Sequence, residues 1–201
     1  MRGWGRWGAA LLIGALSLPS AAKCTSSPLD GDVMLSESAS RLIEAFECDD
    51  AALEKARADK PASTAAMAAS SDAVITGAIQ VVDVSESGSS VVATIDGLDA
   101  EGGTRTVTLE LWPSSGTTAD DAAKAIPVGA DLVVYATEDA TWCGTEVEAS
   151  DTAVTPVSPY GLIIALGDTA KDDELVWPLL RRTSWAPLEE APLGGSQDRG
   201  Y

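Results

Sequence analysis

A series of short segments rich in β-branched residues, beginning at residue 73, constrains the fold more than any other feature of the chain. In the clearest of them, 104–112, Val107, Leu109 and Leu111 alternate with polar residues. A period of two places the apolar side chains on one face, as in a half-buried antiparallel strand. Similar composition predicts further strands at 73–82, 91–95, 131–137, 162–166 and 175–180. About six strands, with no alternation between strands and helices, favour a small barrel.

A helical pattern precedes the strands. Ala39, Leu42, Ile43 and Phe46 stand at positions i, i+3, i+4 and i+7, which is the spacing of one buried helix face. The order of segments therefore predicts a mainly β protein, in which a short helical segment (36–71) precedes a small antiparallel OB-like barrel (72–182). A small β-sandwich is the alternative. The Pro- and Gly-containing end of the chain, 183–201, is predicted to be a disordered tail.

The first 22 residues have the order of a secretory signal peptide. Arg2 and Arg6 precede an apolar run at 7–18, and small residues follow up to Ala22. The run is shorter than the roughly 18–20 residues that a membrane-spanning helix needs. We expect cleavage after Ala22, export, and a flexible tether over 23–35. The alternative to free secretion is lipidation of Cys24, which would make the protein an envelope lipoprotein, although Lys23 departs from the small residue usual before such a cysteine.

The chain has three cysteines, and an oxidising compartment allows two of them to pair. We expect a Cys48–Cys143 disulfide, with Cys24 lipidated, free or intermolecular. Closing a loop of about 95 residues would stabilise the fold by on the order of 4 kcal/mol. The sequence Trp142-Cys143 has the beginning of a thioredoxin-like redox motif, but Glu146 stands where the second cysteine would be, so a structural disulfide is favoured.

The composition excludes several classes of function. The chain contains no His and no Asn, so catalytic triads that depend on histidine, metal sites that use histidine and N-glycosylation are excluded. It has 13 Lys+Arg against 31 Asp+Glu, and loss of residues 1–22 leaves 11 against 31, a net charge of −20. Such a barrel repels phosphate backbones and anionic lipids, so we expect no nucleic-acid partner and membrane contact only through a lipid on Cys24. No metal site or cofactor is predicted, because the cysteines lack metal-ligand spacing.

Two patterns leave other functions open. Glu110, on the predicted strand 104–112, is the candidate residue for a hydrolase that uses buried carboxylates. Residues 83–88 begin like a calcium-binding loop, but Thr94 occupies the twelfth position, which indicates at most weak binding of divalent cations. The acidic pairs are more typical of solvated turns than of catalytic carboxylates: Asp49-Asp50, Asp120-Asp121, Asp172-Asp173 and Glu189-Glu190. Trp112 and Trp177, each at the end of a predicted strand, are expected to pack against the barrel.

Four segments resemble a class of exported bacterial proteins of unknown function: 71–79, 126–135, 159–164 and 175–179. Those proteins carry a small OB-like barrel, similar in outline to the inhibitory domain of metalloprotease inhibitors. The resemblance implies the same fold and export, and it supplies no catalytic residues. The sequence therefore predicts an exported, non-catalytic β-barrel that binds a protein or glycan at the cell envelope. A hydrolase and a weak cation-binding protein are the alternatives.

Overall fold

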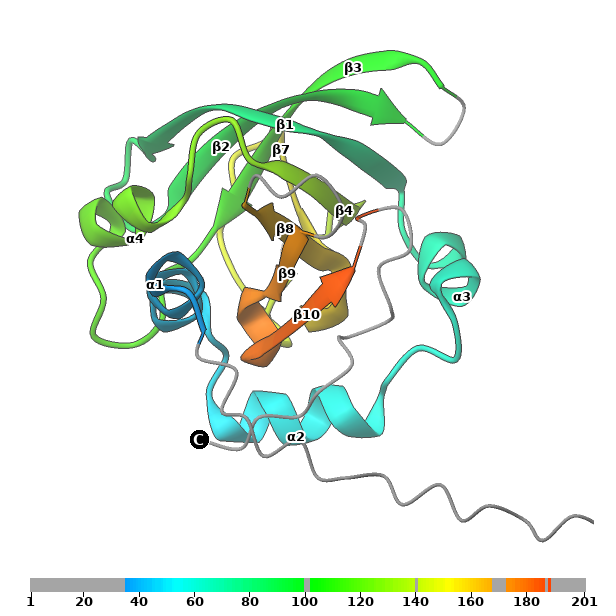
Figure 1. The fold of residues 1–201 in the computed structure, drawn as a ribbon, viewed down its shortest axis with the longest axis horizontal. Helices are drawn as coiled ribbons and strands as arrows, with labels where there is room; N and C mark the ends of the chain where they lie inside the picture. The colour runs from blue at the N-terminus through cyan, green and yellow to red at the C-terminus, as the bar shows by residue number, and fades with distance from the viewer. Residues whose placement is uncertain (1–34, 100–101, 140, 168–172, 187, 189–201) are drawn as a thin grey trace, which may run out of the picture. The chain divides into compact units, whose positions relative to one another are not determined.

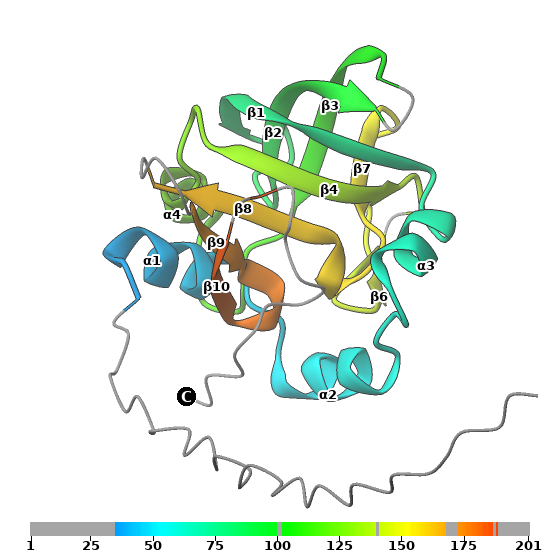
Figure 2. The same cartoon turned by 45° about the vertical axis from the view of Figure 1, so that its right-hand side comes forward.

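The computed structural model describes residues 35–99, 102–139, 141–167, 173–186 and 188 (Figures 1 and 2). The predicted signal peptide and Cys24 lie outside the described residues, as does the predicted tether except for Leu35. All described residues belong to one structural unit.

Five strands close into a barrel. They are β1 (Ala73–Val84), β2 (Val91–Asp99), β3 (Thr104–Leu111), β4 (Asp131–Thr137) and β7 (Ala153–Pro156). The closed order is β1-β2-β3-β7-β4, with β4 pairing back to β1. This arrangement confirms the prediction of a mainly β, OB-like barrel preceded by helices. One pairing, β3 with β7, is parallel, and the other pairings in the barrel are antiparallel.

The long strand β1 closes the barrel because it pairs with two neighbours. Residues 75–84 pair with β2, and residues 73–78 pair with β4. Gly77 stands opposite Gly97, and a Cβ atom on Gly77 would lie 2.3 Å from the carbonyl oxygen of Asp96. A side chain at position 77 would therefore collide with backbone. Glycine permits the close approach of β1 and β2 that the barrel needs.

The sheet continues beyond the barrel through three further strands. β8 (Leu162–Leu166) pairs with β4, β9 (Asp173–Trp177) with β8, and β10 (Arg182–Ala186) with β9. The predicted strand 175–180 ends at Trp177, because Pro178 begins the short 3₁₀ helix η2 (Pro178–Leu180). Residues 183–186, which the sequence analysis placed in the tail, are ordered by pairing with β9, and Thr183 and Ser184 are buried.

The described residues contain four α-helices beside the strands. The predicted helical segment contains α1 (Glu37–Phe46), α2 (Asp50–Ala58) and α3 (Thr64–Ala69), and the apolar face of α1 is buried as predicted. The helix α4 (Ala119–Ala125), between β3 and β4, was not predicted. Helix α1 packs against α4, η2 and β9. Helix α2 runs below the strand layer in Figures 1 and 2, close to the 3₁₀ helix η1 (Pro159–Gly161) that precedes β8.

Candidate functional site

The connection from β4 to β7 carries a small hairpin. Its strands, β5 (Thr141–Trp142) and β6 (Thr145–Glu146), are joined by Cys143 and Gly144. Both joining residues have positive φ, 50° and 79°, which is the requirement of a type I′ hairpin turn. The indole of Trp142 packs against that of Trp112, with ring centroids 5.7 Å apart. Strands of two residues are too short to be stable alone, so the hairpin depends on such outside contacts.

A disulfide supplies the strongest of these contacts. Cys143, at the tip of the hairpin, is bonded to Cys48, which lies between α1 and α2, with the two Cα atoms 5.6 Å apart. The predicted Cys48–Cys143 pairing is thereby confirmed. The backbone N–H of Cys48 also donates to the carbonyl of Leu179, 3.3 Å away. The disulfide therefore fixes the hairpin to the start of α2.

Arg181 contacts the same junction. Its Nε lies 2.7 Å from Oε2 of Glu47, and one of its terminal nitrogens lies 2.9 Å from Oδ1 of Asp50. The other terminal nitrogen donates to the carbonyl of Cys48 at 3.1 Å. Arg181 thus contacts three groups of the α1–α2 junction, and its side chain is only 25% exposed, so these contacts are partly desolvated. The N-terminus of α2 is thus held by both a covalent and an ionic contact.

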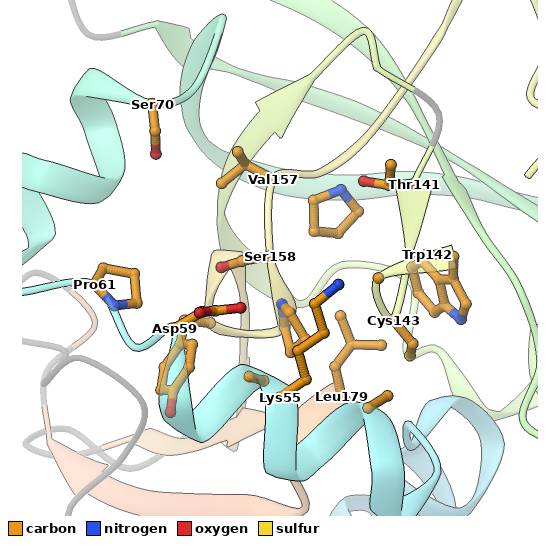
Figure 3. Close-up of a pocket in the computed structure, with 16 residues that line it drawn as sticks. Lys55, Asp59, Pro61, Ser70, Thr141, Trp142, Cys143, Val157, Ser158 and Leu179 are labelled. Carbon is orange, nitrogen blue, oxygen red and sulfur yellow. The ribbon is translucent and has the colours of Figure 1, made fainter. Parts of the chain in front are cut away.

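A pocket of about 340 Å³ lies between α2 and the hairpin (Figure 3). Its wall is mainly apolar and is formed by Ala52, Ala56, Pro61, Trp142, Cys143, Gly144, Pro156, Val157, Pro159, Tyr160 and Leu179. Ligand sites typically measure about 300–1,000 Å³ and combine apolar walls with a few polar groups. The size and lining of this pocket match the lower end of that class.

Two charged side chains line the pocket: Lys55 of α2 and Asp59, the residue directly after α2 (Figure 3). They stand one helical turn apart, and no ion pair joins them among the described residues. The ammonium of Lys55 lies close to the hairpin, since a Cβ atom on Gly144 would be 3.7 Å from Nζ. Hydroxyl groups of Ser70, Thr141 and Ser158 complete the polar part of the lining. The pocket therefore offers a positive group, a negative group and hydroxyls on an apolar background.

Glu110, the predicted catalytic candidate, is buried but is not among the residues that line this pocket. Both of its carboxylate oxygens accept hydrogen bonds. The hydroxyl of Ser90 donates to one at 2.5 Å, and the backbone N–H of Ser150 donates to the other at 2.8 Å. Glu110 therefore connects β2 and β3 to the connection between β4 and β7.

The other sequence candidates whose side chains are described do not line the pocket. The loop at 83–88 is the turn between β1 and β2, and no three His, Cys, Asp or Glu side chains gather to hold a metal ion among the described residues. Asp49 caps α2, and Asp121 pairs with Lys124 at 3.0 Å. The side chains of the Asp172-Asp173 and Glu189-Glu190 pairs lie outside those described. Trp177 is fully buried, as predicted for packing against the barrel.

Sequence reasoning did not find the pocket. Its walls come from α2, the hairpin and the segment 156–160, which are far apart in the chain. Two local signals were present: the Cys143-Gly144 turn pair between short polar and aromatic segments, and the charges of Lys55 and Asp59 at i, i+4. Neither local signal predicts which distant segment of the chain packs beside these residues.

Comparison of the chain with family models, with curated proteins and with solved structures gave no match. Of the helices in the described part of the chain, none has the length and apolar character that crossing a bilayer requires.

Proposed function

We propose that this chain is an exported, non-catalytic β-barrel protein that binds a protein or glycan partner at the cell envelope. The partner contacts the pocket between α2 and the β5–β6 hairpin. The observation that carries this proposal is the pocket itself: an apolar concavity of about 340 Å³ with Lys55 and Asp59 projecting into it.

The position of the pocket on the fold supports this assignment. OB-type barrels bind ligands with the face of their second and third strands and with two loops, one of which joins the fourth and fifth barrel strands. Here β7 is the fifth strand of the barrel, so the connection between β4 and β7 is the equivalent of that loop. The hairpin that forms one wall of the pocket belongs to this connection.

The rigidity of the walls also favours binding. Association loses free energy when mobile loops must be ordered, and a preformed site avoids much of that loss. The Cys48–Cys143 disulfide fixes the hairpin, and Arg181 fixes the beginning of α2. A disulfide in this position is consistent with the predicted export, because disulfides persist in oxidising compartments.

The non-catalytic part of the proposal rests on the state of Glu110. A catalytic carboxylate must reach a substrate, whereas both oxygens of Glu110 accept hydrogen bonds from Ser90 and Ser150. Neither donor is a pocket residue. We therefore assign Glu110 a structural role.

The test is to screen the purified, disulfide-bonded protein against a panel of envelope peptides and glycans by ¹⁵N–¹H correlation spectra. We expect a bound compound to shift the amide signals of α2 and of the hairpin. Ala52→Phe, which fills the pocket, should abolish the shifts. Ala51→Phe is the matched control, because Ala51 is exposed on the same helix and does not line the pocket.

Two results would overturn the proposal. One is binding that survives Ala52→Phe unchanged, which would place the partner elsewhere. The other is chemical turnover of a panel compound, which would contradict a non-catalytic function.

A further inference from the structure

We infer that the pocket takes a zwitterionic ligand the size of a dipeptide, whose carboxylate meets Lys55 and whose ammonium meets Asp59. This inference rests on the binding role proposed above for the pocket and goes beyond it, because a free dipeptide is a smaller ligand than the protein or glycan partner named there.

The two charges point to different ends of the pocket. In Figure 3 the Lys55 side chain extends toward Thr141 and Cys143, whereas the carboxylate of Asp59 lies on the side of Ser158 and Pro61. Side chains at i, i+4 on a helix have Cβ atoms about 5–6 Å apart and are well placed to pair with each other. Lys55 and Asp59 form no such pair in the described structure.

Ion pairing differs among the charged residues in and next to α2. Arg57 and Glu54, on the same helix but outside the pocket lining, form an ion pair at 2.6 Å. The two charged residues that line the pocket, by contrast, have no ion-pair partner among the described residues. Both groups are therefore available to a ligand.

Charge complementarity favours a zwitterion over the other ligand classes. The chain carries a net charge of −18, which repels an anionic ligand at long range. A cationic ligand would bring a like charge to Lys55, and a neutral sugar would partly desolvate both charges without a counter-charge for either. A ligand with one carboxylate and one ammonium matches both groups and approaches as a neutral molecule.

Length selects a dipeptide rather than a single amino acid. An extended chain spans at most about 3.3–3.6 Å per residue, so two residues separate their terminal charges by roughly 7 Å. The Lys55 and Asp59 side chains extend toward different ends of the pocket, so a ligand with two well separated charges fits both. A pocket of about 340 Å³ with Trp142 and prolines in its wall favours small apolar side chains on the ligand.

The test is calorimetry of the disulfide-bonded protein with the dipeptide Ala-Val, with its N-acetyl form and with its C-terminal amide. We expect Ala-Val to bind, and each modification to weaken binding roughly tenfold or more, because each removes a charged hydrogen-bond partner. The Lys55→Gln variant should bind Ala-Val and its C-terminal amide equally. In Asp59→Asn the free amine and the N-acetyl form should bind equally.

Arg57→Gln and Glu54→Gln are the matched controls, since they remove the same charges from the same helix outside the pocket. Both should keep the full preference for free Ala-Val. Equal binding of all three compounds to the unmodified protein would overturn the zwitterion inference. The zwitterion inference would also be overturned if Ala-Val failed to bind while another peptide or a glycan of the panel still shifted the amide signals of the pocket. In that case the proposed function would stand. If no compound of any class shifts those signals, the proposed function fails as well.

Discussion

Removal of the Cys48–Cys143 disulfide should destabilise the protein strongly while leaving the barrel strands folded. The bridge joins residues 95 positions apart. Under the chain-entropy relation, a loop of that length stabilises the folded state by about 4.7 kcal/mol at 25 °C, because the unfolded chain is constrained. For a domain of this size each kcal/mol corresponds to about 2–4 °C in Tm, so Tm should fall by about 10–20 °C.

The assay is urea unfolding followed by circular dichroism, applied to the oxidised protein, the reduced protein and the Cys48→Ala/Cys143→Ala variant. Reduction removes only the bond, whereas the variant also removes the sulfur of buried Cys48, so the reduced protein isolates the effect of the bridge. We expect the reduced protein and the variant to lose the amide signals of the folded hairpin in ¹⁵N–¹H correlation spectra and to keep those of the barrel strands. A loss of less than about 1 kcal/mol on reduction would refute the reasoning, because it would mean that the unfolded chain gains little freedom.

Three further predictions follow from individual contacts. Gly77→Ala should destabilise the barrel by roughly 3 kcal/mol or more, measured by urea unfolding, because its Cβ atom would meet the carbonyl oxygen of Asp96; a loss below about 1 kcal/mol would show that the strands can separate. Glu110→Gln should lower the free energy of unfolding in urea by about 1–3 kcal/mol and leave ligand binding unchanged. If the substitution instead removed a measured activity and left the stability intact, the hydrolase alternative would be favoured. The pKa of Asp72 is lowered from 3.8 by the backbone N–H of Glu138 and the hydroxyl of Thr137, which both donate to Oδ2. Because this pKa is lower in the folded than in the unfolded protein, the ionised carboxylate stabilises the fold above pH 3.8, and this contribution is lost as the pH falls through the pKa of the folded protein. The difference in the free energy of unfolding between the wild type and Asp72→Asn should therefore shrink between pH 5 and pH 2. A difference that does not depend on pH would contradict this account.

The parts of the fold that the sequence predicted are those with a strong local signal. Alternation identified β3, and dense β-branched residues identified β1, β4 and β8. The 3.6-residue period identified α1, whose apolar face is buried. The Cys48–Cys143 pair could be predicted because the chain contains few cysteines and one of the three stands next to the predicted signal peptide.

The elements that were missed have weak or conflicting signals. Helix α4 has seven residues, too few to show a clear period, although the cap residue Thr118 and two acidic residues in its first turn were visible. Strand β7 has four residues and ends in Pro156, which normally argues against a strand. Strand β10 is polar in sequence and is ordered by its neighbour β9. In each case tertiary contacts outweigh local preference.

The pocket belongs to a different category, because no local pattern could have predicted it. Its lining residues come from 52–61, 70, 141–144, 156–160 and 179. Their juxtaposition depends on the path of the β4–β7 connection and on the disulfide that holds it. Once the disulfide is known, the nearness of α2 to residue 143 follows, but the shape and charge of the space between them do not.

The pocket lies away from the strand face that nucleic-acid-binding barrels of this type use. Barrels that bind single strands use cations and stacking aromatic side chains on their second and third strands. Here β2 and β3 contain no aromatic residue, and Arg105 is their one cation. Their outward polar groups also satisfy each other, since the hydroxyl of Thr106 donates to Asp96 at 2.7 Å.

An aromatic and a cationic group instead line the pocket: Trp142 of the β4–β7 connection and Lys55 of α2. Under the function proposed above, the barrel is a rigid frame, and the partner is bound beside a loop that a disulfide fixes in place and not on the strand face. Because the strand face and the pocket use different residues, they can be separated experimentally. Adding positive charge to the outer face of β2 and β3 should leave dipeptide affinity unchanged, whereas removing the single charge of Lys55 should eliminate its preference for a free carboxylate.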